Sequence, residues 1–414
     1  MPARIRPALL PSLLIGLLAG CGGGNSSTTT TADSASPGAA IAARPPKAPA
    51  PPAPPTLAQV GNRLFDETSL SASGKLACAS CHVEARAHAD AAGGFLPLGG
   101  VDGNRQGLRS SPSLRYLDQA GPFTFDAQGR PRGGLFWDGR ANSRAEQARG
   151  PLFNATEMAN TDAATLAARL RALPYAADLR AAAALPAAAT DEQWVDAAVT
   201  ALTRYQVDDA KFHPFTSKFD AVQDGRAAFT LQEQRGLTAF NDPQRGNCAS
   251  CHDSRPHPAT GRALFTNFSY HALGVPRNQS QATANPTFFD LGLCGPQRAD
   301  LAGRNDLCGQ FRVPSLRNVA LTGPYFHNAR FAKLEDVLAF YATRDLDPVR
   351  WYPVVNGQVQ LYNDLPPAYR THVHQGAPFR RAGQPPAITP QDAADIIAFL
   401  HTLSDGFTTG ASAQ

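Results

Sequence analysis

Apolar side chains recur at helical spacing in five stretches of this chain. These stretches are residues 57–64, 194–205, 231–240, 334–341 and 392–403. In each of them, apolar residues three or four positions apart fall on one face, which is typical of a helix packed against a core. The pair Thr389-Pro390 is a start signal for the last stretch. The pattern predicts a mainly helical fold.

The N-terminal segment, residues 1–55, has a different pattern. Residues 1–20 contain two charged residues, Arg4 and Arg6, followed by an apolar run that is too short to cross a bilayer. This combination predicts a signal peptide. The run ends in Leu-Ala-Gly before Cys21, which resembles a bacterial lipobox and predicts a lipid on Cys21. An ordinary signal peptide with an incidental cysteine is the alternative.

Residues 21–55 are rich in Gly, Ser, Thr and Pro, and this composition predicts a flexible linker without a fold of its own. We therefore expect a folded body that begins near Thr56. The whole segment predicts a periplasmic protein that touches a membrane through its lipid anchor alone, with the outer membrane favoured.

Composition and charge narrow the class of function. The chain has 414 residues, of which 43% are apolar and 17% charged, so it can bury a sizeable core. The formal net charge is +4, and removal of the leader with Arg4 and Arg6 leaves +2, without a dense run of Lys or Arg. We do not expect nucleic acid as a partner, because binding to its backbone needs a concentrated basic surface.

A five-residue string occurs twice and carries the most specific chemistry. Cys78-Ala-Ser-Cys81-His82 recurs as Cys248-Ala-Ser-Cys251-His252. The pattern C-x-x-C-H is the attachment signature of a c-type haem, in which the cysteines form thioethers and the histidine binds the iron. Zinc-binding pairs or thioredoxin-like redox sites are the alternatives. The sequence predicts two covalently bound haem c groups, with His82 and His252 as iron ligands.

The distance between the two motifs predicts two domains. We expect an N-terminal haem domain at 56–215, a C-terminal haem domain at 216–405 and a flexible tail at 406–414. Cys294 and Cys308 remain, in a stretch rich in Gly, Asn and Asp that predicts a surface loop. In an oxidising compartment they predict a structural disulfide.

Methionine is too scarce to complete both haem sites. Electron-carrier cytochromes usually close the sixth iron position with Met or His. This chain has two methionines, Met1 in the leader and Met158. The remaining sixth ligands must therefore be His or a rarer donor such as Tyr, or the position is open to peroxide or oxygen.

Three further strings accompany the haem motifs. They are Phe136-Trp137-Asp138-Gly139-Arg140, the segment from Gly150-Pro151 to Glu157-Met158, and the segment from Val313-Pro314-Ser315-Leu316-Arg317-Asn318 to Pro324-Tyr325-Phe326-His327-Asn328. Together with the haem motifs they resemble the bacterial di-haem cytochrome c peroxidase and MauG superfamily, over residues 57–405. The resemblance implies two cytochrome c-like helical domains, a peroxidatic N-terminal haem and a C-terminal haem that relays electrons.

The resemblance also implies roles around the N-terminal haem. Trp137 matches a tryptophan that lies between the two haems; a core aromatic at a contact between the domains is the alternative. Many peroxidases of the family carry a distal histidine after the first motif, but residues 95–108 contain none. His88 lies only six residues after His82, and we interpret it as a solvated or hydrogen-bonding surface residue. We therefore expect an open N-terminal haem.

For the C-terminal haem, the resemblance implies a tyrosine ligand. Classical peroxidases of the family have a methionine fourteen residues after the His of the Tyr-Phe-His string, and this chain has Tyr341 there. MauG-like members have a ligating tyrosine at this place. A buried core tyrosine with a hydrogen bond is the alternative.

Peroxide cleavage needs a group that moves a proton between its two oxygens, and a carboxylate suits this task. Glu157 matches the family position for it; the alternative is an exposed glutamate at a helix start, with Asp162 or Glu146 as substitutes. Gln147 and Pro151 match positions that line the distal pocket of MauG-like members, and Gln147 is expected to orient peroxide or water. Loop packing is the alternative for both.

The family also places a calcium ion between the domains. Thr322 and Pro324 match two of its carbonyl ligands, and Ser110 stands where the family usually has an asparagine side chain. Calcium prefers six to eight oxygens, some of them from water. We expect calcium here, with Ser110 as a weaker donor.

These expectations combine into one leading function. It is a di-haem peroxidase that reduces hydrogen peroxide to water with electrons from a small periplasmic donor, a cytochrome c or a cupredoxin. One alternative is a MauG-like oxidase that modifies a protein or an organic substrate. A second alternative is a di-haem electron carrier without enzyme activity.

Overall fold

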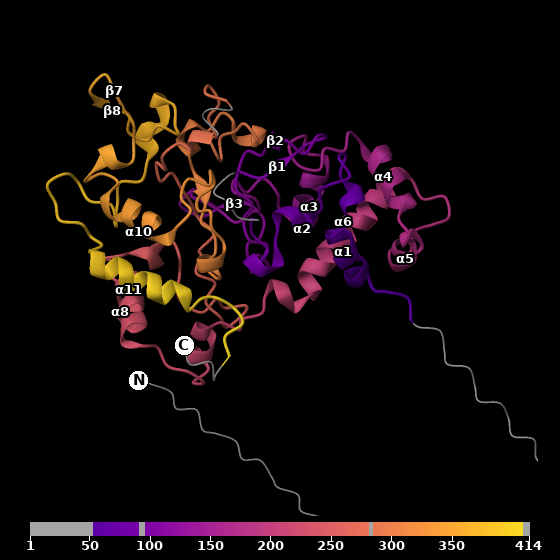
Figure 1. Cartoon of the computed structure of the whole chain (residues 1–414), viewed down its shortest axis with the longest axis horizontal. Coiled ribbons are helices and arrows are strands. Elements are labelled where there is room, and N and C mark those ends of the chain that lie inside the picture. Colours follow the sequence, from indigo (N-terminus) through magenta and orange to yellow (C-terminus); the bar gives the residue numbers. More distant parts are fainter. Residues whose placement is uncertain (1–52, 91–95, 281–284, 409–414) are drawn as a thin grey trace, which may run out of the picture. The chain divides into compact units, whose positions relative to one another are not determined.

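Helices carry most of the regular structure (Figure 1). The computed structural model describes residues 53–90, 96–280 and 285–408. Its α-helices are α1 (Leu57–Phe65), α2 (Cys78–Cys81), α3 (Arg144–Phe153), α4 (Ala163–Ala172), α5 (Ala176–Ala182), α6 (Asp191–Asp208), α7 (Lys218–Gln223), α8 (Leu231–Asn241), α10 (Leu334–Thr343) and α11 (Pro390–His401). The five predicted helices are confirmed as α1, α6, α8, α10 and α11.

The remaining regular elements are short. Eight two-residue strands form four antiparallel pairs: β1 (Leu98–Gly99) with β2 (Arg105–Gln106), β3 (Thr124–Phe125) with β4 (Pro131–Arg132), β5 (Tyr270–His271) with β6 (Phe311–Arg312), and β7 (Val354–Val355) with β8 (Gln358–Val359). The 3₁₀ turns are η1 (Thr68–Leu70), η2 (Glu84–Arg86), η3 (Ala210–Phe212), η4 (Cys248–Ser250), η5 (Ala299–Leu301), η6 (Asn305–Leu307), η7 (Val319–Leu321), η8 (Pro348–Arg350) and η9 (Pro367–His372). The fold is thus mainly helical, as predicted.

Local sequence explains where the principal helices begin. At α1, the Thr56 hydroxyl accepts a hydrogen bond from the Gln59 amide at 3.2 Å, and the Gln59 side chain accepts one from the Thr56 amide at 2.8 Å. Helices α6, α8 and α11 begin with the same capping box, at Thr190, Thr230 and Thr389. Each box satisfies amides that a helix start leaves without partners.

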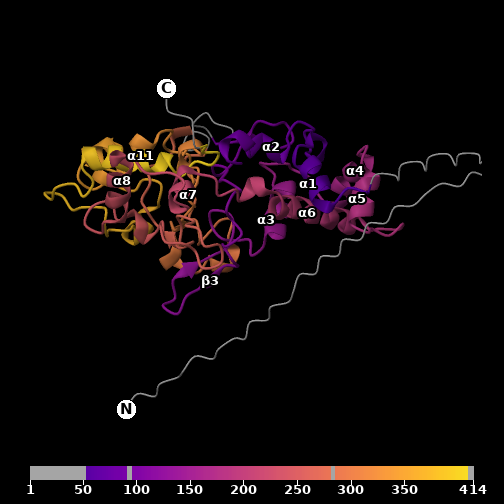
Figure 2. The same cartoon turned by 90° about the horizontal axis from the view of Figure 1, so that it is seen from below.

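Each haem motif lies, in chain order, between the two helices of one packed pair, and both pairs are built in the same way. Helix α1 packs on α6, and α8 packs on α11 (Figures 1 and 2). A Cβ at Gly61 would collide with the carbonyl oxygen of Ala201, and a Cβ at Gly236 would collide with that of Asp395. Both crossings therefore need glycine for the close approach of two backbones.

The apolar side chains form separate cores around these pairs. Most members of the first core lie between Val60 and Phe212, and Leu264 and Phe268 join them from later in the chain. The second core lies between Phe219 and Leu403. The described residues from Ala53 onwards nevertheless form one compact unit, so the boundary at 215/216 stays a prediction.

Two further predictions concern cysteines and the membrane. Cys294 and Cys308 are joined in a disulfide with an S–S distance of 2.00 Å, and both are buried. The proposed signal peptide, Cys21, the linker up to residue 52 and the end of the tail lie outside the described residues. Within the described part, no helix combines the length and the apolar character needed to span a bilayer.

Candidate functional site

The first haem motif lines a large cavity. Helix α2 carries Cys78 and Cys81, and His82 follows as its C-cap. All three line a cavity with a volume of about 740 Å³. The Nδ1 atom of His82 lies 3.0 Å from the carbonyl oxygen of His88, which holds the ring by one nitrogen and leaves Nε2 for a metal.

The four residues expected at the distal side of this haem share the same cavity. Trp137, Gln147, Pro151 and Glu157 all line it. Gln147 and Pro151 lie on α3, and Glu157 lies in the turn that follows this helix. Among the described residues that line the cavity, His82 is the sole histidine. No second imidazole from the described part therefore competes for the position opposite His82.

The alternatives for Glu157 lie elsewhere. Asp162 is the N-cap of α4, where its side chain accepts a hydrogen bond from the Thr165 amide. Glu146 lies in the first turn of α3 and accepts a hydrogen bond from the Asn142 amide. Neither lines the cavity that contains His82.

The charge state of Glu157 depends on opposing effects. Burial raises the pKa of its carboxyl group, while the nearby Arg140 guanidinium and a hydrogen bond from Asn154 lower that pKa. The Asn154 amide nitrogen lies 2.7 Å from Glu157 Oε1. A carboxyl group with a raised pKa can exchange a proton near neutral pH.

His88 differs from the interpretation made from sequence. It is 1% exposed and stacks on Phe212 with ring centroids 4.3 Å apart, so it is a core residue and not a surface one. Its Nδ1 atom accepts a hydrogen bond from Arg115 Nε at 3.3 Å, and burial lowers its pKa to about 4. Its hydrogen-bonding role is thus confirmed, and its side chain does not line the cavity around His82.

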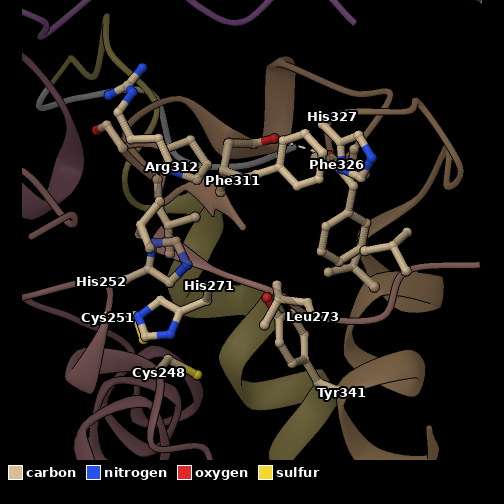
Figure 3. Close-up of a pocket in the computed structure, with 18 of the residues that line it drawn as sticks. Cys248, Cys251, His252, His271, Leu273, Phe311, Arg312, Phe326, His327 and Tyr341 are labelled. Atoms are coloured by element: carbon tan, nitrogen blue, oxygen red, sulfur yellow. Dashed lines mark hydrogen bonds between the residues drawn. The ribbon is translucent and has the colours of Figure 1, made fainter. Parts of the chain in front are cut away.

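The second haem motif lines a second cavity, of about 240 Å³. Cys248 and Cys251 lie at η4, and the Nδ1 atom of His252 lies 3.1 Å from the carbonyl oxygen of Phe265. Burial lowers the pKa of His252 to about 4, so its imidazole is neutral, as a metal ligand must be. Helix α10 directs the Tyr341 phenol into the same space as the His252 ring (Figure 3).

The surroundings of Tyr341 leave its hydroxyl group available to a metal. Its hydroxyl group has no hydrogen-bond partner among the described residues, and burial raises its pKa. Its ring stacks on Phe379, with centroids 5.6 Å apart. A phenol that opens into the cavity without a protein partner fits a metal ligand better than a core tyrosine with a hydrogen bond.

Sequence reasoning missed two histidines in the second cavity. His271 on β5 and His374 both line it, with ring centroids 5.6 Å apart. His271 Nε2 lies 3.4 Å from Cys251 Sγ and 3.0 Å from Ser269 Oγ. Each is a single histidine outside any motif, so only the fold brings it to this cavity.

Side chains between the cavities connect them. Trp137, Ser110 and Arg312 line both cavities. The Trp137 indole donates a hydrogen bond to the Ser110 carbonyl at 2.9 Å, and Arg312 Nε donates one to the Phe136 carbonyl at 3.0 Å. Arg312 is 5% exposed, and its Nη1 atom has no hydrogen-bond partner among the described residues.

These residues fit two covalently attached haems. The four motif cysteines are free thiols, and each motif histidine keeps one ring nitrogen for a metal. A buried guanidinium with an unsatisfied N–H needs an anionic acceptor, and a haem propionate is one. The donor set therefore suits haem c in both cavities.

The residues expected to hold calcium fit that ion only in part. No described N–H group donates to the carbonyl oxygens of Thr322 and Pro324, so both are available as ligands. Ser110, however, donates its hydroxyl hydrogen to the Phe326 carbonyl at 2.8 Å. In addition, the Arg86 guanidinium donates to the carbonyl of Gly323, between the two expected ligands, and its charge opposes a cation.

Comparisons with known proteins give a consistent result. The family model described as di-haem cytochrome c peroxidase matches residues 55–228. The methylamine utilization protein MauG of Paracoccus denitrificans is 35% identical over 370 residues, which are 84% of this chain and 88% of that protein. Cytochrome c551 peroxidase of Nitrosomonas europaea is 30% identical over 285 residues, 68% of this chain and 71% of that protein.

Solved structures agree with these relatives. The crystal structure of the diheme peroxidase BthA from Burkholderia thailandensis superposes with a TM-score of 0.75 at 40% identity, over 85% of this chain and 86% of that one. A MauG-like protein associated with microbial copper homeostasis superposes with a TM-score of 0.60 at 27% identity, over 85% of this chain and 91% of that one. The similarity thus extends over most of both chains.

Proposed function

This chain belongs to the bacterial di-haem cytochrome c peroxidase and MauG family, and from that premise we propose that it reduces hydrogen peroxide to water. Membership makes it a haem oxidoreductase with two c-type haems. When bound, the haems supply the redox chemistry of peroxide cleavage. The electrons come from a small donor protein, a cytochrome c or a cupredoxin, and enter at the second cavity.

A single observation carries this proposal. Glu157, Gln147 and Pro151 line the cavity of His82, and no other described histidine lines it. A carboxylate there accepts a proton from peroxide and returns it to the leaving oxygen. Gln147 offers an amide that can orient peroxide, and Pro151 shapes the wall.

The side chains between the cavities suit electron transfer. Trp137 lines both cavities, and its indole is held by the Ser110 carbonyl. We propose it as the relay between the two haems. The Tyr341 phenol, as the second ligand of the C-terminal haem, favours the oxidised metal because it is a hard anionic donor.

The experiment is steady-state peroxide turnover by the di-haem protein with a reduced cytochrome c as donor. We expect E157Q to lose about 10²- to 10⁴-fold in rate, because an amide cannot carry the proton. E146Q is the matched control, since Glu146 lies on α3 outside the cavity, and it should keep the wild-type rate. Full turnover by E157Q would overturn the proposal.

A MauG-like oxidase is the second candidate. It is favoured by Tyr341 and by the 35% identity to MauG. Peroxide added without an electron donor should then lead to oxidation of a protein or organic substrate, detected by mass spectrometry. Rapid turnover with reduced cytochrome and no such product supports the peroxidase. The third alternative, an electron carrier, requires two low-spin haems, whereas we expect the ferric spectrum to show one high-spin haem.

Export, anchoring and calcium are separate proposals. We propose that residues 1–20 direct export to the periplasm and that Cys21 carries a lipid favouring the outer membrane; C21S should then release the protein from the membrane fraction. We also propose a weakly held calcium ion at the carbonyls of Thr322 and Pro324 with Ser110 nearby. Arg86 weakens it by charge repulsion.

A further inference from the structure

The side chain of Asn154 is aimed at the carboxylate that the proposed function uses. We infer that Asn154 is a positioning residue, which holds Glu157 by one oxygen and reserves the other oxygen for proton transfer. This inference rests on the proposed function, because it assigns the geometry of the same proton carrier.

The orientation of the Asn154 amide is determined by its neighbours. Its Oδ1 atom accepts hydrogen bonds from the Thr156 amide at 2.9 Å and from the Thr156 hydroxyl at 3.0 Å. Because the Thr156 backbone N–H can only donate, the amide oxygen must face Thr156 and the NH₂ group must face Glu157. The bond from Asn154 Nδ2 to Glu157 Oε1, at 2.7 Å, follows from this orientation.

The backbone around Glu157 is held independently. The Asn154 carbonyl accepts hydrogen bonds from the amides of Glu157 and Ala159, both at 3.0 Å, and the Gly100 amide donates to the Glu157 carbonyl at 2.8 Å. A Cβ at Gly99 would collide with the Thr156 carbonyl oxygen, so β1 lies directly against this turn. With the backbone held, the Asn154 side chain sets the direction of the carboxylate.

The two carboxylate oxygens therefore differ. Oε1 is bound to Asn154, and no described donor bonds to Oε2, which is available to a substrate in the cavity. A hydrogen bond to the ionised carboxylate stabilises it against the effect of burial. Glu157 can thus accept a proton at neutral pH although its surroundings are largely apolar.

Other charged or titratable groups around the cavity do not replace the role of Asn154. The nearby guanidinium of Arg140 also lowers the pKa of Glu157, and it is itself bound to Asp138 at 2.9 Å. The remaining charged or titratable side chains that line the cavity are Arg105, Arg109, Arg312, His82, Cys78 and Cys81. A change at Asn154 alters none of these side chains.

The test uses two variants of the di-haem protein and two measurements. In N154A, the ionised form of Glu157 loses its hydrogen bond, so its pKa rises. The decline of kcat/KM for hydrogen peroxide on acidification should then begin about one pH unit higher. N154D keeps an acceptor for Thr156 but faces Glu157 with a carboxylate, so the decline should begin higher still.

The second measurement does not use activity. An infrared pH titration of the carboxyl band that is absent in E157Q follows Glu157 directly, and its midpoint should rise in the same order. N142A is the matched control, because Asn142 also binds a backbone amide, that of Phe123, at an exposed position. It should leave both midpoints unchanged. A wild-type Soret band shows that each variant has folded with its haems.

The outcomes separate this inference from the proposed function. Full turnover by E157Q overturns the proposed function, whatever Asn154 does. If E157Q is inactive while N154A and N154D keep the wild-type midpoints in both measurements, the positioning role is wrong. If N154A does not fold, N154D decides the question, because it preserves the acceptor that holds the turn.

Discussion

At the scale of single residues, the character of the second cavity depends on the proposed ligand Tyr341. Its phenol points into the space that His252 and His271 also enter (Figure 3). The phenol and the His271 imidazole are both able to bind a metal. Chemistry favours Tyr341, because His271 already lies within hydrogen-bond distance of Ser269 Oγ and Tyr341 has no described partner.

We predict that Y341F changes the C-terminal haem without emptying the cavity. The phenyl ring keeps the stacking on Phe379 but removes the ligand oxygen. The ferric spectrum should shift from low spin to high spin, and the reduction potential should rise by on the order of 0.1 V, within the range that axial ligands span. Electron paramagnetic resonance and a spectroelectrochemical titration measure both effects.

The control for Y341F is Y325F. Tyr325 lines the same cavity, but its hydroxyl donates to the Val319 carbonyl at 3.0 Å. Removal of this hydroxyl group should leave the ferric spectrum unchanged. A low-spin spectrum that survives Y341F and disappears in H271A would assign the ligand to His271 instead.

Arg86 is the second residue with a specific prediction. Its guanidinium binds the Gly323 carbonyl, between the expected calcium ligands Thr322 and Pro324. Replacement by Gln removes a positive charge, so R86Q should bind calcium about tenfold more tightly, which corresponds to about 1.4 kcal/mol. Calorimetric titration of protein treated with a chelator measures the affinity. Equal affinities in R86Q and in R130Q, which removes an exposed arginine, would contradict the prediction.

At the scale of elements, both crossed helix pairs have a glycine where the two backbones approach closely. Gly61 on α1 and Gly236 on α8 each lie against a backbone carbonyl of the partner helix. Helix periodicity predicted all four helices, but it did not predict which positions tolerate no side chain. That requirement comes from the distance between two helices, which is a tertiary property.

We predict that G61A and G236A each destabilise the protein by at least about 2 kcal/mol, because a buried Cβ has no space. Denaturant unfolding followed by circular dichroism measures the loss. G303A is the matched control: a Cβ there meets no atom within 4 Å, and its φ is not in the left-handed region. It should change the free energy of unfolding by less than about 1 kcal/mol. A similar loss in all three variants would exclude the backbone collision as the cause.

At the scale of the whole molecule, a buried ion network joins distant segments near Trp137. Arg109 binds Asp138 at 2.7 Å and Asp290 at 2.6 Å, and all three side chains are at most 8% exposed. Arg298 adds a hydrogen bond to the Asp138 carbonyl at 2.9 Å. Asp138 follows Trp137 directly in the chain, so the network holds the proposed relay between the cavities.

We predict that R109L costs about 3–5 kcal/mol, because it leaves the buried carboxylate of Asp290 without a cation and leaves Asp138 paired with Arg140 alone. The free energy of unfolding measures this loss, and electron transfer between the haems should slow with it. The control is R130L, which breaks the exposed pair with Asp126 and should cost less than about 1 kcal/mol. Equal losses of unfolding free energy in the two variants would show that the network does not stabilise the protein to this extent.

The candidate site could be anticipated to different degrees. The haem motifs, and the face of α10 on which Tyr341 lies, depend on residues close together in the chain. Both could therefore be predicted from the sequence. The choice of Glu157 over Asp162 and Glu146 came from a family pattern, and the cavity agrees with it. His88 was misplaced at the surface, because its burial depends on Phe212, far along the chain.

The sequence by itself determined where haem attachment is expected, which histidine follows each motif, and which stretches form the principal helices. These features follow from neighbouring residues, whose covalent spacing and capping hydrogen bonds need no distant partner. Only the tertiary structure decided which side chains share a cavity: Arg312 and Trp137 between the two, His271 beside Cys251, and Asn154 against Glu157. The reason is physical, since such groupings depend on contacts between segments that lie together only after the helices have packed.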